Sequence, residues 1–443
     1  MTSDTVGRAR PALQPETARR MAFLASFGDD SDRLRSPAGS VSARAASPAA
    51  KLPRAAIGRA ARTIDRIGYV QIDTISVVER AHHHVLWSRD RSFAPGTIDA
   101  LEAPPRRAFE YWAHAAAYLP MGDYRYCLPR MRRIAASGHE WFPTDAGVVD
   151  WVRDRIRAEG PLRSKDFESE GARGPWWDWK PAKAALEFLF QSGELMVVSR
   201  PGFQKLYDLT ERALDPGVDT RYPDDDEMAD WYVRRAAAAF GVFEPRDIAY
   251  MRKDATGGIK TAVGRAVERG DIVEAVLAGP ESRPCLVDPR LLAAASRRRR
   301  AAPDGGPGPV RILSPFDNLI IDRRRTARFI GLEYTLECYV PAGKRCFGYY
   351  ALPVFLADAP VGLLDCKADR KRGVLLVLAS RFSFDRVETG RGGGPCLRLR
   401  DLPAAEADGL ALEGFGMAMA DELRAYAAFN GCADYRDAGT AGC

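Results

Sequence analysis

The chain lacks the short motifs that mark the common classes of enzyme. It has no GxSxG turn, no GxxxxGK[ST] loop, no HExxH pair and no GxGxxG at a strand-to-helix turn. These absences remove the usual signals of α/β-hydrolases, of nucleotide- and dinucleotide-binding proteins, and of zinc proteases. We therefore expect no cofactor.

Paired cysteines and long apolar runs are also missing. The eight cysteines are scattered from Cys127 to Cys443 without a CxxC pair, which predicts neither a bound metal nor a disulfide framework and fits a reducing cytoplasm. No apolar run approaches the roughly 18 to 20 residues of a membrane helix. The start of the sequence has no apolar signal core, so we expect a cytoplasmic protein with no membrane partner.

Size and charge permit a nucleic-acid partner without requiring one. The chain has 443 residues, of which 46% are hydrophobic, enough for two to four compact units. Its formal charge is +6, from 65 Lys and Arg against 59 Asp and Glu. The excess is clustered, as in Arg297–Arg300 and Arg323–Arg325, although such runs are as often solvated faces as binding sites.

The N-terminal part has the element order of a winged helix. Apolar spacing predicts a helix over Glu16–Phe27, a mobile loop over Gly28–Ala50, a second helix over Lys51–Ile67 and a strand over Tyr69–Ile75. Gly68 is suited to close the second helix. A winged helix places one helix in a DNA groove. The basic residues on or near the polar side of the second helix, predicted to contact DNA, are Arg54, Arg59 and Arg62.

A similar order recurs twice. The second copy comprises helical patterns over Val148–Glu159, Leu162–Glu168 and Lys180–Ser192 and a hairpin in ELMVVSRPGFQKLYDL, and it adds Lys180 and Lys183 as predicted DNA contacts. The third copy begins at Asp226, continues through Pro245–Met251 and Gly258–Arg269, and ends in the strand DIVEAVL.

Short strands dominate beyond the polar segment Arg297–Pro309. The stretches TLECYV, CFGYYALPVFL, PVGLLDCKAD and GVLLVLASRF are rich in β-branched and aromatic residues, and a helix is predicted near Gly414–Ala428. We therefore predict an α+β protein with three tandem winged-helix units and a β-rich, barrel-like C-terminal domain. The predicted boundaries are 1–142, 143–217, 218–296 and 297–443.

Two polar residues are predicted to share one face of the strand after the basic helix. Side chains alternate along a strand, so Gln71 and Asp73 point to one side while Val70 and Ile72 point to the other. This pattern fits a half-exposed edge strand whose polar side chains face water. It also fits a hydrolytic site, in which Asp73 holds or deprotonates a water that Gln71 orients, opposite a sugar acquiring positive charge.

Several basic residues near this strand are further candidates. The consecutive histidines His82, His83 and His84 cannot all face one site on a strand, which argues against a metal cluster. Packing and phosphate contact are the roles considered for this stretch. The arginines predicted to position phosphate are Arg80, Arg89 and Arg91. A lone histidine in an apolar stretch, such as His114, is more often a core residue than a catalyst. Arg80, His82 and His114 are candidates to line the site.

The chain resembles the YcaQ (AlkX) and AlkZ winged-helix DNA glycosylases over nearly its whole length. The stretches that carry the resemblance are YVQIDTISVVERAHHHVLWSRD, FEYWAHAAAYLPMGDYRYCLPRM, SPFDNLIIDRRR, LECYVPAGKRCFGYYALPV and VGLLDCKADRK. The resemblance implies three winged helices and a β-barrel-like domain in a C-shaped molecule with a basic concave surface. It also implies a monomer. The loop at Gly28–Ala50 departs from the family pattern in being longer.

The resemblance also assigns an activity and a motif. The family's active site is a strand motif of Gln-apolar-Gln or Gln-apolar-Asp, and Gln71-Ile72-Asp73 has the second form. That form is typical of the YcaQ-like branch, which implies excision of N7-alkylguanine and unhooking of interstrand crosslinks, leaving abasic sites. The implied partner is double-stranded DNA with alkylated or crosslinked guanine, at the nucleoid. Because such a base is already a cationic leaving group, one carboxylate suffices, unlike the two of ordinary glycosidases.

A crosslinked guanine restricts how the enzyme can approach it. A base tied to the opposite strand cannot swing freely into a deep pocket, so we expect an open basic cleft with a hairpin or loop in the minor groove. The segment Ser314–Arg325 is a candidate to line or flank that cleft, with Arg323, Arg324 and Arg325 as DNA contacts. Its Asp317 and Asn318 equally fit caps of a local turn.

Two other classes of protein remain open from the sequence. Winged helices are common in transcriptional regulators, and fold alone does not decide function. A lesion-binding protein without catalysis would use the same basic surface. A regulator has no need of Gln71 and Asp73 together, so substitution of Asp73 separates these classes.

Overall fold

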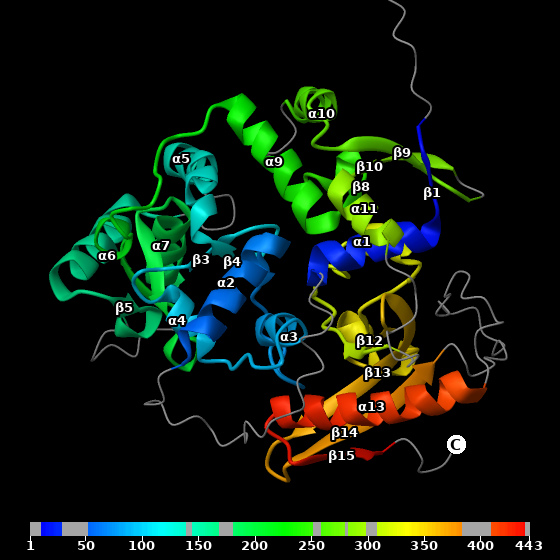
Figure 1. Cartoon of the computed structure of the whole chain (residues 1–443). Coiled ribbons are helices and arrows are strands. Elements are labelled where there is room, and N and C mark those ends of the chain that lie inside the picture. Colours follow the sequence, from blue (N-terminus) through cyan, green and yellow to red (C-terminus); the bar gives the residue numbers. More distant parts are fainter. Residues whose placement is uncertain are drawn as a thin grey trace, which may run out of the picture.

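The computed structural model describes residues 10–28, 52–138, 144–167, 180–250, 258–279, 282–297, 308–382 and 409–438 (Figure 1). Most of the predicted loop Gly28–Ala50, and Arg298–Arg300 of the basic run, lie outside these residues. Within the described parts, helices and sheets are mixed, and the predicted α+β class is confirmed. None of the described helices is long and apolar enough to cross a membrane.

Three groups of elements share one strand order, and we call them the first, second and third units. The first comprises α2 (Arg54–Ile67), β2 (Val70–Gln71), α3 (Ala81–Trp87), α4 (Thr97–Glu102), β3 (Ala108–Trp112) and β4 (Ala116–Pro120). The strand after the first helix pairs with the second strand of the hairpin, giving the order β2-β4-β3. Gly68 closes α2 at a φ of 81°, in the left-handed region that favours glycine.

The second and third units repeat this arrangement. The second comprises α6 (Ala146–Glu159), β5 (Leu162–Arg163), η3 (Ser164–Phe167), α7 (Lys180–Gln191), β6 (Leu195–Ser199) and β7 (Leu206–Leu209). The third comprises α9 (Asp225–Phe240), β8 (Val242–Phe243), η5 (Pro245–Asp247), α10 (Ile259–Glu268), β9 (Val273–Leu277) and β10 (Arg283–Val287). Their strand orders are β5-β7-β6 and β8-β10-β9.

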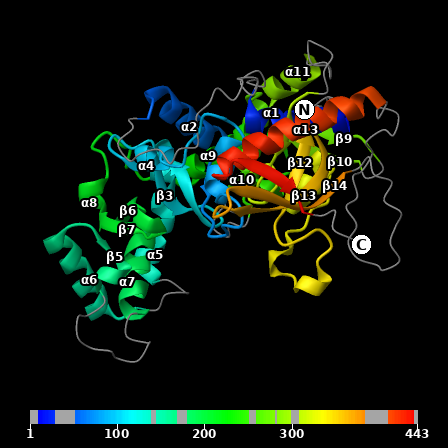
Figure 2. The same cartoon turned by 90° about the horizontal axis from the view of Figure 1, so that it is seen from below.

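Connecting elements lie between these units. After the first unit come η2 (Met121–Cys127) and α5 (Leu128–Ser137), and η4 (Pro201–Phe203) forms the turn between β6 and β7. α8 (Thr210–Ala213) follows the second unit, and α11 (Pro289–Arg297) follows the third. Figure 2 shows the second unit at one end of the molecule, the C-terminal sheet at the other, and the first unit between them.

The helix predicted over Glu16–Phe27 does not pack as part of the first unit. α1 (Pro15–Phe27) contacts α9, α11 and η6 (Thr326–Ile330). It shares a core with Val242 and Phe355, so it does not open the first unit. The short strand β1 (Ala12–Leu13) before it adds to the third sheet, parallel to β9. The apolar spacing over Glu16–Phe27 predicted a buried face correctly, but spacing cannot say which partner covers it.

The C-terminal sheet has the order β11-β12-β13-β14-β15. Its strands are β11 (Val310–Ile312), β12 (Ala351–Leu356), β13 (Ala359–Asp369), β14 (Val374–Phe382) and β15 (Asp434–Asp437). α13 (Gly409–Phe429) shares a core with this sheet and with α3 (Figure 1). Between β11 and β12 lie α12 (Arg323–Arg325), η6 (Thr326–Ile330), η7 (Glu337–Tyr339) and η8 (Ala342–Lys344). The predicted strand TLECYV is therefore wrong, since its centre is the short helical turn η7.

Candidate active site

Gln71 lies on β2, an edge strand of the first sheet. Its backbone pairs with β4, and its side chain is buried. The Oε1 atom lies 2.9 Å from Nε2 of His114, which stands on the turn between β3 and β4. Because the amide oxygen can only accept, His114 donates in this arrangement. His114, which the sequence offered only as a candidate to line the site, is therefore in contact with Gln71.

Two tyrosines hold the His114 ring. Tyr69 and Tyr250 both meet the ring edge to face, with centroids 5.3 Å and 5.4 Å away. Tyr250 comes from the third unit and donates to the carbonyl of Ile321 at 3.2 Å. Rings packed in this way restrict the imidazole to one orientation. His114 is therefore fixed from two sides, and it fixes Gln71 in turn.

Asp73 lies just past the end of the strand. The predicted strand Tyr69–Ile75 is regular only over Val70–Gln71. Its ladder ends because the Asp73 carboxylate accepts from the backbone N–H of Ile75 at 2.7 Å, which turns the chain. Asp73 is partly exposed, and burial raises its pKa above 3.8, opposed by the Ile75 hydrogen bond and by the charge of Arg80. A raised pKa makes the ionised carboxylate a better base.

The C-terminal domain faces Asp73 across the site. Burial raises the pKa of Cys338, and the neighbouring charge of Asp73 adds to this rise. Tyr339 beside it is 84% exposed. The segment is anchored by Glu337, whose carboxylate accepts from the backbone N–H groups of Cys346, Phe347 and Gly348. Asp73 therefore lies where the first unit meets an anchored segment with an exposed aromatic ring.

Arg80 and His82 meet the hairpin turn of the second unit. The Arg80 guanidinium lies 3.5 Å from the ring centroid of Phe203. His82 stacks on the same ring at 5.8 Å and is 2% exposed. Burial lowers the pKa of His82 well below 6.5, so the ring is neutral at physiological pH. The charge of Arg80 acts on Asp73, whereas His82 packs against Phe203 and has no such contact with Asp73 in the described residues.

The segment Ser314–Arg325 supports β2 from the interior instead of lining an open cleft. The Asn318 side chain donates to the carbonyls of Ile67 and Tyr69 at 3.2 Å and 2.9 Å. Asp317 accepts two hydrogen bonds from Arg89 at 2.6 Å and 2.9 Å. These contacts fix the chain on both sides of the helix-to-strand junction at Gly68.

Several arginines predicted to contact DNA are committed to the interior. Arg89 is 1% exposed in its pair with Asp317 and also bonds Ser26. Arg91 donates to both oxygens of Glu422, each at 2.7 Å, and Arg325 donates to the carbonyl of Phe240. Arg323 donates to two backbone carbonyls. A buried guanidinium must be paired, and separating such a pair costs about 3 to 5 kcal/mol, so these residues do not form a phosphate-binding surface.

The other predicted DNA contacts lie nearer the surface. Arg54 and Arg62 are exposed on α2, whereas Arg59 is paired with Asp90 at 2.7 Å. Arg324 is half exposed and donates to Asp247. Lys183 is exposed on α7, and the side chain of Lys180 lies outside the description. The structure thus joins Gln71 to His114 and places the charge of Arg80 near Asp73. Arg54 and Arg62 remain exposed on α2.

Sequence reasoning missed the residues that reach this site from other units. Tyr69 could have been noticed beside the motif, but Tyr250, Phe203 and Glu337 are distant in sequence and carry no local signal. The histidines His82–His84 lie on α3, a helix, and not on the strand first assumed. In the described residues, no group of at least 3 His, Cys, Asp or Glu side chains could hold a metal ion.

Comparisons with known proteins place these features in one family. Residues 64–429 match the model of the AlkZ-like DNA glycosylase family. The solved structure of DNA glycosylase AlkZ from Streptomyces sahachiroi is similar to the chain, with a TM-score of 0.54 and 13% identity. That similarity covers 96% of this chain and 100% of the other. At this identity the structural match shows a shared fold, whereas the family match spans the whole candidate site.

Proposed function

The chain belongs to the AlkZ-like DNA glycosylase family, and we propose that it hydrolyses the N-glycosidic bond of N7-alkylated guanine and unhooks interstrand crosslinks between such guanines. The product would be an abasic site. The observation that carries this proposal is the pair formed by a buried, oriented Gln71 and a partly exposed Asp73. An N7-alkylguanine departs as a neutral base, so catalysis needs one carboxylate and an oriented water.

In the proposed mechanism Gln71 orients the water and Asp73 accepts its proton. With Oε1 of Gln71 engaged by His114, its amide nitrogen remains to donate to a water oxygen. Asp73 then accepts a proton from that water as it bonds to C1′ of the deoxyribose. The bond from C1′ to N9 of guanine breaks, and its electron pair neutralises the alkylated base. The carboxylate also stabilises the positive charge that develops on the sugar.

The placement of the two residues fits a lesion that stays in the duplex. Asp73 lies outside the regular strand and is partly exposed, so it can meet a sugar at the surface of the protein. A crosslinked base cannot rotate into a closed pocket. Tyr339, beside Cys338, is exposed and lies near the charge of Asp73. We therefore propose that Tyr339 contacts the DNA groove next to the lesion.

The repeated units are proposed to hold the DNA. Their helix, strand, helix and hairpin order is that of winged helices, and we propose the boundaries 1–142, 143–217, 218–296 and 297–443 for the units and the C-terminal domain, with α1 contributed to the third unit. The exposed Arg54 and Arg62 are proposed to contact phosphate. We further propose that the protein acts as a C-shaped monomer on nucleoid DNA in the cytoplasm.

Cleavage of defined lesions tests the proposal. Duplex DNA with one N7-methylguanine, and separately a nitrogen-mustard crosslink, is incubated with protein and treated with hot alkali, which breaks the strand at abasic sites. We expect scission with the wild type and none with Asp73→Asn. Asp166→Asn is a matched control, since Asp166 follows the corresponding strand of the second unit and likewise accepts from a backbone N–H. Tight binding of lesion DNA without scission would reject the glycosylase proposal in favour of a lesion-binding protein.

A further inference from the structure

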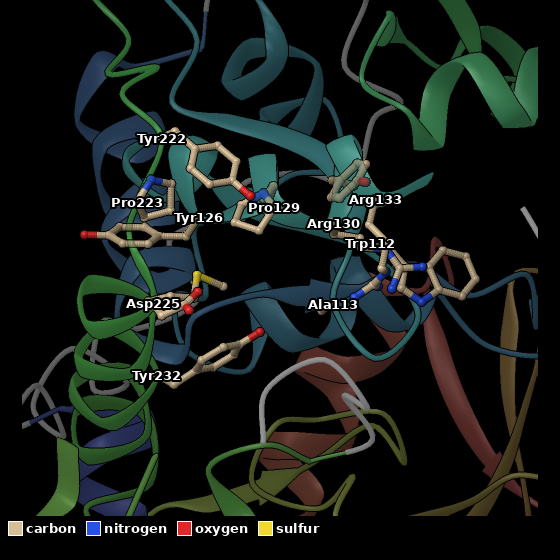
Figure 3. A pocket seen from close by; sticks show the side chains of 13 residues that line it. Trp112, Ala113, Tyr126, Pro129, Arg130, Arg133, Tyr222, Pro223, Asp225 and Tyr232 are labelled. Atoms are coloured by element: carbon tan, nitrogen blue, oxygen red, sulfur yellow. The ribbon is translucent and has the colours of Figure 1, made fainter. Parts of the chain in front are cut away.

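A hollow lies beside the candidate active site. It has a volume of about 130 Å³ and opens between the end of β3, the start of α5 and the start of α9. Figure 3 shows Trp112 and two arginines at one end and Tyr126, Tyr222 and Tyr232 around the other. The proposed chemistry at Gln71 and Asp73 uses none of these side chains.

The aromatic walls are exposed yet held in place. Trp112 and Tyr222 are 37% and 45% exposed, whereas surface aromatic rings of this size are usually covered. Tyr126 stacks on Trp231 with centroids 4.8 Å apart, and Arg132 backs the Tyr222 ring at 3.9 Å. Rigid aromatic faces open to solvent are typical of stacking platforms for nucleic-acid bases.

Charge is divided between the two ends of the hollow. Arg130 and Arg133 of α5 line the end at Trp112, and the Arg130 guanidinium lies 5.9 Å from the Trp112 ring centroid. Nε of Arg130 is buried and has no hydrogen-bond partner in the part of the chain that the structure describes. Asp225 lines the other end. Arginines suit a phosphate, whereas a carboxylate suits the N–H donors on the edge of a guanine or cytosine.

The hollow and the candidate active site share the β3–β4 hairpin. Trp112 and Ala113 line the hollow, while His114 on the same turn contacts Gln71. Trp112 pairs with Ala116, whose carbonyl accepts from the N–H of Ile72, so Trp112 lies two strands from the Gln71-Ile72-Asp73 motif. Two strand spacings are about 10 Å. That distance is about three base steps along one DNA strand.

We propose that this hollow binds one unpaired nucleotide within a few positions of the lesion. Its base would stack against Trp112 and the tyrosines, and its phosphate would contact Arg130 and Arg133. In a duplex both faces of a base are covered by its stacked neighbours and its edge is paired, so the occupant must be displaced from the duplex. The proposal rests on the proposed function for the position of the lesion, but the binding of a nucleotide does not require base excision.

Fluorescence of a base analogue tests the site directly. The probe is a duplex with a tetrahydrofuran abasic analogue and 2-aminopurine placed one to three positions away in the same strand. The variants are Trp112→Leu and, as a matched control, Trp151→Leu, because Trp151 is also exposed but lies on α6 away from the hollow. We expect binding of the wild type to change the 2-aminopurine emission at one position, because the base leaves the duplex stack and stacks on Trp112. Trp112→Leu should alter this change, while Trp151→Leu should preserve it. The same emission change with both variants would overturn the proposal.

Two further variants keep the test independent of folding and of catalysis. Tyr222 lies outside the helices and strands, and Tyr222→Leu is expected to weaken binding of a single-stranded oligonucleotide by about 5- to 100-fold, the range for one lost stacked base. Arg133→Gln is expected to lower the slope of log affinity against log salt by about one. Unchanged affinity with Tyr222→Leu, and an unchanged slope with Arg133→Gln, would each contradict the site. If binding follows these expectations and no base is released, the nucleotide site stands and the proposed function fails.

Discussion

In the first and third units, the strand after the first helix pairs with the same strand of the hairpin, yet the residues on the two strands differ in kind. β2 carries Val70 and Gln71, whereas β8 carries Val242 and Phe243. The valines are both fully buried. Phe243 is also fully buried and joins the core of its own unit, while Gln71 turns an amide towards His114.

The second unit completes the comparison. Its strand β5 carries Leu162 and Arg163, and Arg163 is paired with Asp166 of the same unit. The same place in the fold therefore carries an amide, an arginine or a phenylalanine. One buried aliphatic residue suffices to anchor the strand in the core, so the residue at the next position can differ between units. We expect that only the first unit has a catalytic residue at this position.

The largest expected effect comes from making the first unit resemble the third. Gln71→Leu keeps the volume of the side chain but removes the amide that orients the water. We expect release of N7-methylguanine to slow by about 100- to 1,000-fold, the range for one oriented polar group in a catalytic site. Alkaline scission of lesion DNA measures the rate. Arg163→Leu, at the equivalent position of the second unit, is the control, and equal losses in both variants would remove the distinction between the units.

A second prediction concerns Glu102, the last residue of α4 in the first unit. Glu102 is buried with both oxygens unpaired in the described residues, and burial together with the charge of Glu110 raises its pKa to about 8. The unfolded chain releases this proton near pH 4.5, so stability falls as the pH rises from about 4.5 to about 8. Each unit of pKa shift corresponds to about 1.4 kcal/mol.

Glu102→Gln removes that penalty. We expect its thermal midpoint to exceed that of the wild type at pH 9 and to approach it at pH 4. Thermal unfolding followed by circular dichroism across this range measures the difference. A constant difference at all pH values would show that Glu102 does not titrate between the folded and unfolded states.

His114 is expected to act as a positioning residue through Gln71. His114→Phe preserves the contacts with Tyr69 and Tyr250 but removes the donor to Gln71, and we expect roughly a tenfold slower release of base, at the lower end of effects seen for such groups. Single-turnover kinetics separates this loss from DNA binding. In the Gln71→Leu background, the same change should have no further effect. An additive loss would instead assign His114 a direct contact with the lesion.

The smallest expected effect is a shift in pH dependence. Asp73 must be ionised to act, so activity should fall as the pH falls through its raised pKa. Arg80 lowers that pKa, and Arg80→Gln should therefore move the acid limb of the rate profile to higher pH. Single-turnover rates measured from acid to neutral pH report the shift. A shift towards lower pH would contradict the proximity of Arg80 to Asp73.

Local patterns predicted many of the helices and strands but little of what surrounds the candidate site. Alternation singled out Gln71 and Asp73, but the regular strand covers only Val70–Gln71, and the roles of the two residues stay a prediction. Apolar spacing predicted most of the helices and the β6–β7 hairpin. The same spacing could not say that α1 joins the third unit, because a buried face does not name its partner. It also gave no sign of Tyr250, which reaches His114 from the third unit.

The arginines show most clearly what the sequence alone could not predict. In the sequence a guanidinium suggests a surface, because burying an unpaired charge is costly. Arg89 and Arg91 escape that cost through Asp317 and Glu422, which are 228 and 331 residues away along the chain. Only the fold reveals such partners. Charge counts therefore overestimated the DNA-binding surface in this chain.

The pairing of β1 with β9 affects the order of events during synthesis. The two strands lie 264 residues apart, counted between Arg10 and Glu274, which are joined by an ion pair. Ribosomes add about 5 to 20 residues per second, so about 13 to 50 seconds pass between the appearance of the two strands. For most of that interval α1 lacks α9, and throughout it α1 lacks α11 and η6, the other elements that cover its apolar face. A helix made early is thus among the last to be packed. We expect nascent chains that end before the third unit to bind chaperones through α1.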